Sequence, residues 1–216
     1  MGRQASQDVI LDPKDYGVLS LYYHSAEVAI YTIIENMNED FAKSSANPNS
    51  VVDSWMNLQN IDVTGHSKGG AIATLIAYYL PIRLGWHFLR KRHLGPKGFD
   101  AHAFSAKVRL ATFGSPYVCD ETFAKDFNAK IIQAWRVFRE QDPIPEYWAE
   151  KFIEGSTAKH VGQAVRIPKS WENTIAWEYR WDSLRAYNPH WMKVYEEFCA
   201  HMHEKYNSLQ SDSMSP

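Results

Sequence analysis

The chain has 216 residues, of which 45% are hydrophobic and 22% are charged, and its formal net charge is −2. This length favours one domain with a sizeable core, and the near-neutral charge gives no support for a nucleic-acid partner. No apolar stretch is long enough for a transmembrane helix, and the N-terminus lacks the apolar segment of a signal peptide. The two cysteines, Cys119 and Cys199, are far apart in sequence and fit reduced thiols, so we expect a cytoplasmic protein.

Apolar residues at helical spacing predict five helices along the chain. They are expected over residues 24–41, 51–58 and 71–80, around Phe123 to Ile131, and from about Pro189 onward. Pro81 should end the third helix or start a new segment, because proline lacks the N–H that a helix interior needs. Residues 208–216 are expected to form a disordered tail.

Runs of β-branched and aromatic residues predict the strands that separate these helices. The strands are expected over residues 60–64, 108–113, 132–138 and 164–167. Alternating strands and helices imply an α/β fold, with a mostly parallel sheet flanked by helices in a single domain over residues 1–216. Functional sites in such sheets lie at the carboxyl ends of the strands.

The sequence Gly65-His-Ser-Lys-Gly69 joins the first predicted strand to an alanine-rich helix. This strand–turn–helix context is typical of a nucleophile elbow, in which a strained turn exposes the serine hydroxyl. Ser67 is therefore the candidate nucleophile. Side chains at Gly65 and Gly69 are expected to clash within the turn, and the backbone N–H of Lys68 is the candidate oxyanion donor.

A serine nucleophile needs a base, and the base needs an orienting acid. Asp142 follows the strand at 132–138 and is the best acid, with a loop stiffened by Pro143 and Pro145. Glu140 and Glu146 are its local rivals.

The acid precedes the base in chains built on this kind of elbow, so only histidines after Asp142 qualify. His190 follows the last predicted strand and is the best candidate base, and His160 is the second candidate. His201 and His203 lie well inside the last predicted helix.

These residues resemble the class 3 lipases, a family of α/β-hydrolases, over about residues 24–200. The similarity lies in Val63-Thr-Gly-His-Ser-Lys-Gly-Gly-Ala71, Ala111-Thr-Phe-Gly-Ser-Pro116, Arg136-Val-Phe-Arg-Glu-Gln-Asp-Pro-Ile-Pro145, His160-Val-Gly162 and Asn188-Pro-His-Trp191. The resemblance implies an α/β-hydrolase fold with Ser67 as nucleophile, Asp142 as acid and His190 as base, and it matches His160 to a structural position.

The chain departs from the family in two places. Lys68 stands where members usually carry an apolar residue, although its backbone N–H still suits an oxyanion. The family's second oxyanion donor and its lid lie upstream, in a Phe-Arg-Gly-Thr-like block that residues 1–23 do not contain. Three explanations stay open: an N-terminally truncated chain, a substitute segment, or reduced activity.

The expected function is a serine hydrolase that cleaves carboxylic esters of lipids through an acyl-enzyme, with no cofactor or metal. The alternative is a hydrolase-fold interaction protein with little or no catalysis. Transient contact with a lipid interface is expected, and basic residues around Trp86 in residues 82–106 suit either a membrane-facing loop or, preferably, a solvated excursion. Four tryptophans in residues 171–191 fit either an acyl-binding wall or ordinary packing.

Overall fold

A four-stranded parallel sheet forms the centre of the computed structural model, which describes residues 18, 20–44, 50–90, 99–140, 142–146, 158–168 and 192–213. The strands are β1 (Ile61–His66), β2 (Val108–Phe113), β4 (Gln133–Arg139) and β6 (Gln163–Ile167), in the order β1-β2-β4-β6. Within the described residues β1 and β6 are the outer strands. The predicted parallel α/β fold is confirmed, and all four predicted strands are present to within two residues at each end.

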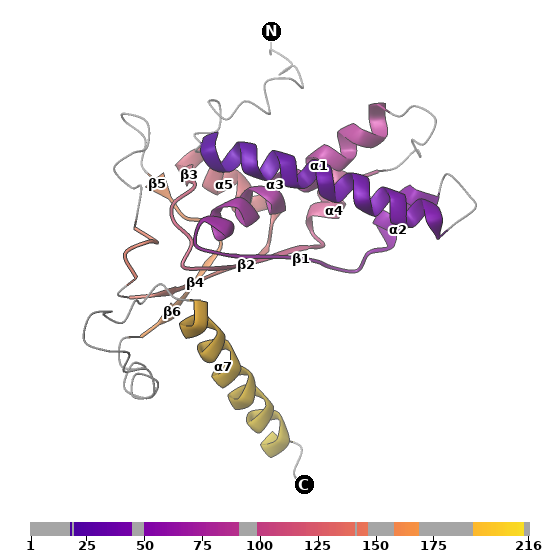
Figure 1. The fold of residues 1–216 in the computed structure, drawn as a ribbon. Helices are drawn as coiled ribbons and strands as arrows, with labels where there is room; N and C mark the ends of the chain where they lie inside the picture. Colours follow the sequence, from indigo (N-terminus) through magenta and orange to yellow (C-terminus); the bar gives the residue numbers. More distant parts are fainter. Residues whose placement is uncertain are drawn as a thin grey trace.

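Helices cover the two faces of this sheet unequally (Figure 1). The helices on one face are α1 (Ser20–Lys43), α2 (Ser50–Asn57), α3 (Lys68–Arg90), α4 (Ala101–Ser105) and α5 (Glu121–Lys130). α7 (Met192–Ser213) lies on the other face. α3 packs directly on β1 and β2, and α1 packs on the outside of α3.

The end predicted for the third helix is wrong, because α3 continues through Pro81 to Arg90. Leu80 and Leu84 are 2% and 0% exposed, so the core holds the helix on both sides of the proline. Burial of this apolar face outweighs the loss of one helical hydrogen bond. Much of the expected excursion at residues 82–106 is therefore helical, in α3 and α4, while residues 91–98 lie outside the described part.

The main core lies between the sheet and the helices α1 to α5. Its largest fully buried side chains are aromatic, namely Trp55, Tyr78, Tyr79, Phe104, Phe123 and Phe127. A second, smaller cluster lies under the start of α7 and contains Val137, Ile167 and Tyr195, with Phe113, Val165 and Phe198 packed around them. α7 is therefore attached to the sheet mainly through its first two turns.

A two-stranded antiparallel ladder of β3 (Cys119–Asp120) and β5 (Ala158–Lys159) joins the segment after β2 to the segment before β6. Val18 bridges Cys119 in antiparallel orientation. The sequence carries no periodic signal for such short strands, and neither was predicted.

The tail predicted over residues 208–216 is wrong for residues 208–213, since α7 extends to Ser213, and residues 214–216 lie outside the described part. The described part of the last helix starts at Met192, so its predicted start at Pro189 lies outside the described residues. The tryptophans of residues 171–191 lie outside them as well. None of the helices in the described ranges combines the length and apolarity that a membrane span requires.

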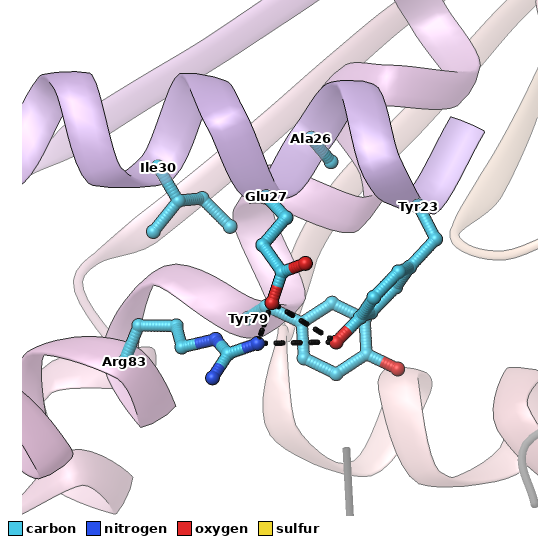
Figure 2. A pocket seen from close by; sticks show the side chains of 6 residues that line it. All are labelled: Tyr23, Ala26, Glu27, Ile30, Tyr79 and Arg83. Carbon is cyan, nitrogen blue, oxygen red and sulfur yellow. Dashed lines mark hydrogen bonds and ion pairs between the residues drawn. The ribbon is translucent and has the colours of Figure 1, made fainter. Parts of the chain in front are cut away.

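An ion pair ties α1 to α3 on the outer side of the helix layer. Glu27 on α1 accepts a hydrogen bond from the Arg83 guanidinium, which also lies 3.1 Å from the Tyr23 hydroxyl. Figure 2 shows the three polar groups converging between the two helices, with Ala26, Ile30 and Tyr79 lining the same small pocket. Burial raises the pKa of Tyr23, opposed mainly by the charge of Arg83. The side chains of Arg83 and Glu27 are only 13% and 29% exposed, so each charge needs the other to compensate for its lost hydration.

We expect Glu27→Ala to lower the free energy of unfolding by about 2 kcal/mol, because it leaves the Arg83 charge largely buried without its carboxylate. Glu39→Ala is the matched control on the same helix. Its ion pair with Lys43 is 67% and 66% exposed, so we expect a loss of less than about 1 kcal/mol. Urea denaturation followed by circular dichroism measures both. Equal losses in the two variants would contradict a structural role for the Glu27–Arg83 pair.

Candidate active site

Ser67 lies in a tight turn between β1 and α3, with a backbone φ of +55°. Among the non-glycine residues that the structure describes, it alone has a positive φ. The Ser67 N–H donates to the Phe113 carbonyl at 2.9 Å, and the Ser67 carbonyl accepts from the Gly70 N–H at 2.9 Å. A left-handed serine costs about 1–3 kcal/mol and persists only where surrounding contacts fix it. The strained turn expected at Ser67 is therefore present, while the role of Ser67 as nucleophile stays a prediction.

Glycine is required at two positions around Ser67, and of the two predicted clashes one is confirmed. A Cβ added at Gly65 would lie 2.2 Å from the Gly69 carbonyl oxygen. The first turn of α3 can therefore pack this close to β1 only if residue 65 is glycine. The predicted clash at Gly69 is wrong, because a Cβ at that position meets nothing within 4 Å. Gly70 is the second tight position, where a Cβ would lie 2.8 Å from the Cβ of Ser115. This contact joins two segments that are far apart in the sequence.

Asp142 is 4% exposed and follows β4 at the carboxyl edge of the sheet. Its Oδ2 accepts a hydrogen bond from the Tyr195 hydroxyl at 2.6 Å, and its Oδ1 accepts one from the Ile144 N–H at 2.9 Å. The Asp142 N–H donates to the Arg139 carbonyl at 3.1 Å. Burial, together with the Asp142 carboxylate, raises the pKa of Tyr195, so its hydroxyl remains a donor. The carboxylate is therefore fixed in place before any substrate binds.

The register of the sheet brings the segments that carry Ser67 and Asp142 to one edge. His66 and Phe113, the last residues of β1 and β2, are paired with each other, and Phe113 is also paired with Val137, two residues before the end of β4. The Tyr195 ring lies 5.7 Å from the His66 ring and 5.9 Å from the Phe113 ring, measured between centroids. Tyr195 thus contacts the residue before the candidate nucleophile and bonds to the candidate acid. No role at the site was predicted for Tyr195, and the available signal was a hydroxyl group on a buried, otherwise apolar helix face.

The other predicted acids are engaged elsewhere. Glu140 is exposed and pairs with Arg166, with 3.2 Å between Oε1 and Nη1. Glu146 accepts a hydrogen bond from the Tyr117 hydroxyl at 3.0 Å and is also exposed. Asp142 is thus the buried carboxylate of the three.

The two candidate bases differ in what the structure describes of them. His190 lies outside the described residues, so its position as base stays a prediction. His160 lies 2.9 Å from the Pro145 carbonyl through Nε2, and its ring stacks on Tyr117 with 3.9 Å between centroids. Burial and then the Arg136 charge lower the pKa of His160 to about 3. Because a carbonyl only accepts, Nε2 carries the ring proton and cannot take one from a serine.

Lys68 opens α3 with an exposed side chain directly after Ser67. Its backbone N–H belongs to the first turn, where N–H groups have no partner inside the helix. This N–H is thus suited to hold a negatively charged oxygen beside Ser67. No cluster of three or more His, Cys, Asp or Glu side chains suited to a metal occurs among the described residues.

Gly65→Ala and Gly70→Ala should each destabilise the fold by about 2 kcal/mol or more, because their Cβ atoms meet atoms that cannot move freely. Gly69→Ala is the control within the same turn. It has open space and a helical position, so we expect a stability within about 1 kcal/mol of the unchanged chain. Thermal unfolding of the three variants tests this order. A Gly69→Ala loss as large as that of Gly65→Ala would contradict it.

One protein family matches the chain. The profile described as Lipase (class 3) matches residues 5–152. Comparison with curated proteins gives no significant match.

Among solved structures, the chain is similar to the Rhizomucor miehei triacylglyceride lipase, with 23% identity, a TM-score of 0.44, and coverage of 69% of this chain and 44% of that one. It is also similar to lipase II from Rhizopus niveus, with 24% identity, a TM-score of 0.36, and coverage of 64% and 43%. A lipase from Rhizopus microsporus var. chinensis gives 23% identity, a TM-score of 0.36, and coverage of 64% and 40%. The chain spans less than half the length of these lipases.

Proposed function

The chain belongs to the class 3 lipase family, and on that premise we propose that it is a serine hydrolase that cleaves carboxylic esters of lipids. The observation that carries the proposal is the left-handed Ser67 at the end of β1, on the same sheet edge as the buried carboxylate of Asp142. A strained serine of this kind is worth its cost where the hydroxyl must be exposed for attack.

In the proposed reaction, the Ser67 Oγ attacks the ester carbonyl carbon while His190 accepts the hydroxyl proton. The carbonyl oxygen becomes an oxyanion, and the Lys68 N–H donates to it. Collapse of this intermediate breaks the bond to the alcohol oxygen, and His190 gives its proton to the leaving alcohol. Water then attacks the acyl-enzyme with His190 as base, which releases the carboxylic acid and restores Ser67.

Asp142 has the role of orienting the His190 imidazole and stabilising its positive charge. Its position supports this role, because two donors already fix the carboxylate. The position of His190 in the sequence also supports its role as the base. Tyr195, which bonds to Asp142, is five residues further along the chain, and five residues span at most about 18 Å.

The Ser67 assignment predicts covalent labelling by a fluorophosphonate probe. We expect Ser67→Ala to abolish labelling and Asp142→Asn to slow it by about 10²–10⁴, because the base loses its orienting charge. Ser115→Ala is the matched control, since Ser115 also follows a strand end and is 4% exposed, and it should label at the rate of the unchanged chain. Folded protein that shows no Ser67-dependent labelling would favour the non-catalytic interaction protein.

The lipid part of the proposal predicts a preference for long acyl chains. With p-nitrophenyl esters of increasing length, kcat/KM should rise by up to about four-fold per methylene until the acyl site is filled, because each buried methylene contributes about 0.8 kcal/mol. Emulsified triglyceride should also be hydrolysed, and Ser67→Ala should abolish both activities. A preference for short soluble esters would contradict the lipid substrate while leaving the serine chemistry intact.

A further inference from the structure

The turn that carries Asp142 has few backbone N–H groups that could hydrogen-bond to the rest of the fold. Pro143 and Pro145 have no N–H, and the Ile144 N–H between them is already donated to the Asp142 Oδ1. The turn must therefore be attached to the rest of the fold through its carbonyl groups and side chains. Two contacts of this kind occur at its end, at Pro145 and Glu146.

Both contacts come from one stacked pair of rings. His160 donates its Nε2–H to the Pro145 carbonyl at 2.9 Å, and the Tyr117 hydroxyl donates to the Glu146 Oε2 at 3.0 Å. The two rings are 3.9 Å apart with an interplanar angle of 23°. Since each ring restricts the other, the two donors act on adjacent residues of the turn as one rigid unit.

The small ladder of β3 and β5 explains why these rings meet. Cys119 pairs with Lys159, which places Tyr117, two residues before the ladder, beside His160, one residue after it. The chain after His160 is fixed as well. Gly162 has φ +72°, its N–H donates to the Asn128 Oδ1 at 2.8 Å, and an added Cβ would lie 2.7 Å from the Ala134 carbonyl oxygen.

The charge states of the two rings suit permanent donors. The pKa of about 3 leaves the His160 imidazole neutral above about pH 4, with its proton on Nε2. Burial, and then Glu146, raise the pKa of Tyr117, which keeps its hydroxyl protonated. Neither donor is lost over the pH range in which a serine hydrolase works.

We infer that Tyr117 and His160 form a clamp on Pro145 and Glu146 that positions Asp142 for catalysis. The inference rests on the proposed function for its catalytic consequence, while the clamp itself is a property of the fold. Tyr117 and His160 are positioning residues here, since they act on the acid through the turn.

The test compares His160→Phe, which keeps a ring on Tyr117 but has no donor, with His160→Gln, whose side-chain amide N–H replaces Nε2–H. Hydrogen exchange of the Ile144 amide is the direct readout, because this N–H bonds to Asp142. In His160→Phe we expect it to exchange about ten-fold faster, with amides of β2 and β4 unchanged. kcat on a p-nitrophenyl ester should fall about ten-fold with KM within about two-fold, and His160→Gln should restore both readouts to within about three-fold.

Three results would overturn the clamp: unchanged exchange at Ile144 in folded His160→Phe, equal loss in His160→Phe and His160→Gln, or faster exchange throughout the sheet. If His160→Phe does not fold, Tyr117→Phe replaces it, because it deletes a single O–H and should speed exchange at Ile144 about three-fold. If the unchanged chain has no Ser67-dependent activity, the proposed function fails, and exchange at Ile144 still decides the clamp.

Discussion

The hydrogen bond from the Ser67 N–H to the Phe113 carbonyl connects the elbow to the rest of the fold. It continues the β1–β2 pairing one residue beyond the end of β1, into a residue whose backbone is left-handed. Gly65 lets the first turn of α3 approach the strand closely, and Gly70 lets the same turn approach Ser115 after β2. The position of the serine is thus decided by close contacts between β1, α3 and the segment after β2.

The acid is held by a different kind of contact. Asp142 is buried by packing on the opposite face of the sheet, where the first turns of α7 contribute Tyr195 to a small apolar cluster. A carboxylate in such surroundings needs donors, because a buried charge without them is costly. The Tyr195 hydroxyl and the Ile144 N–H supply them, so the site depends on a helix that is attached to the sheet mainly through its first two turns.

Much of the fold was readable from the sequence, because its strands and helices carry strong hydrophobic periodicity. Ser67 and Asp142 were chosen as candidates by their positions after predicted strands, which is a local signal. The errors share a physical origin in tertiary contacts. Core packing carries α3 past Pro81, a contact with Ser115 makes Gly70 rather than Gly69 the restricted glycine, and the ladder of β3 and β5 is too short to leave a pattern. The roles of Tyr117 and Tyr195 depend on single hydroxyl groups, which a helix or strand pattern does not distinguish from packing.

The left-handed backbone of Ser67 also bears on the order of folding. The strain is local, whereas the bond that compensates it joins residues 46 positions apart in the sequence. Non-local contacts form late, because the intervening chain must first lose its freedom. In an isolated segment of β1 and α3, we therefore expect the backbone of Ser67 to return to an ordinary conformation with negative φ. We therefore expect the elbow to take its strained geometry only once β2 has docked, which would make the candidate nucleophile a late feature of the sheet to become structured.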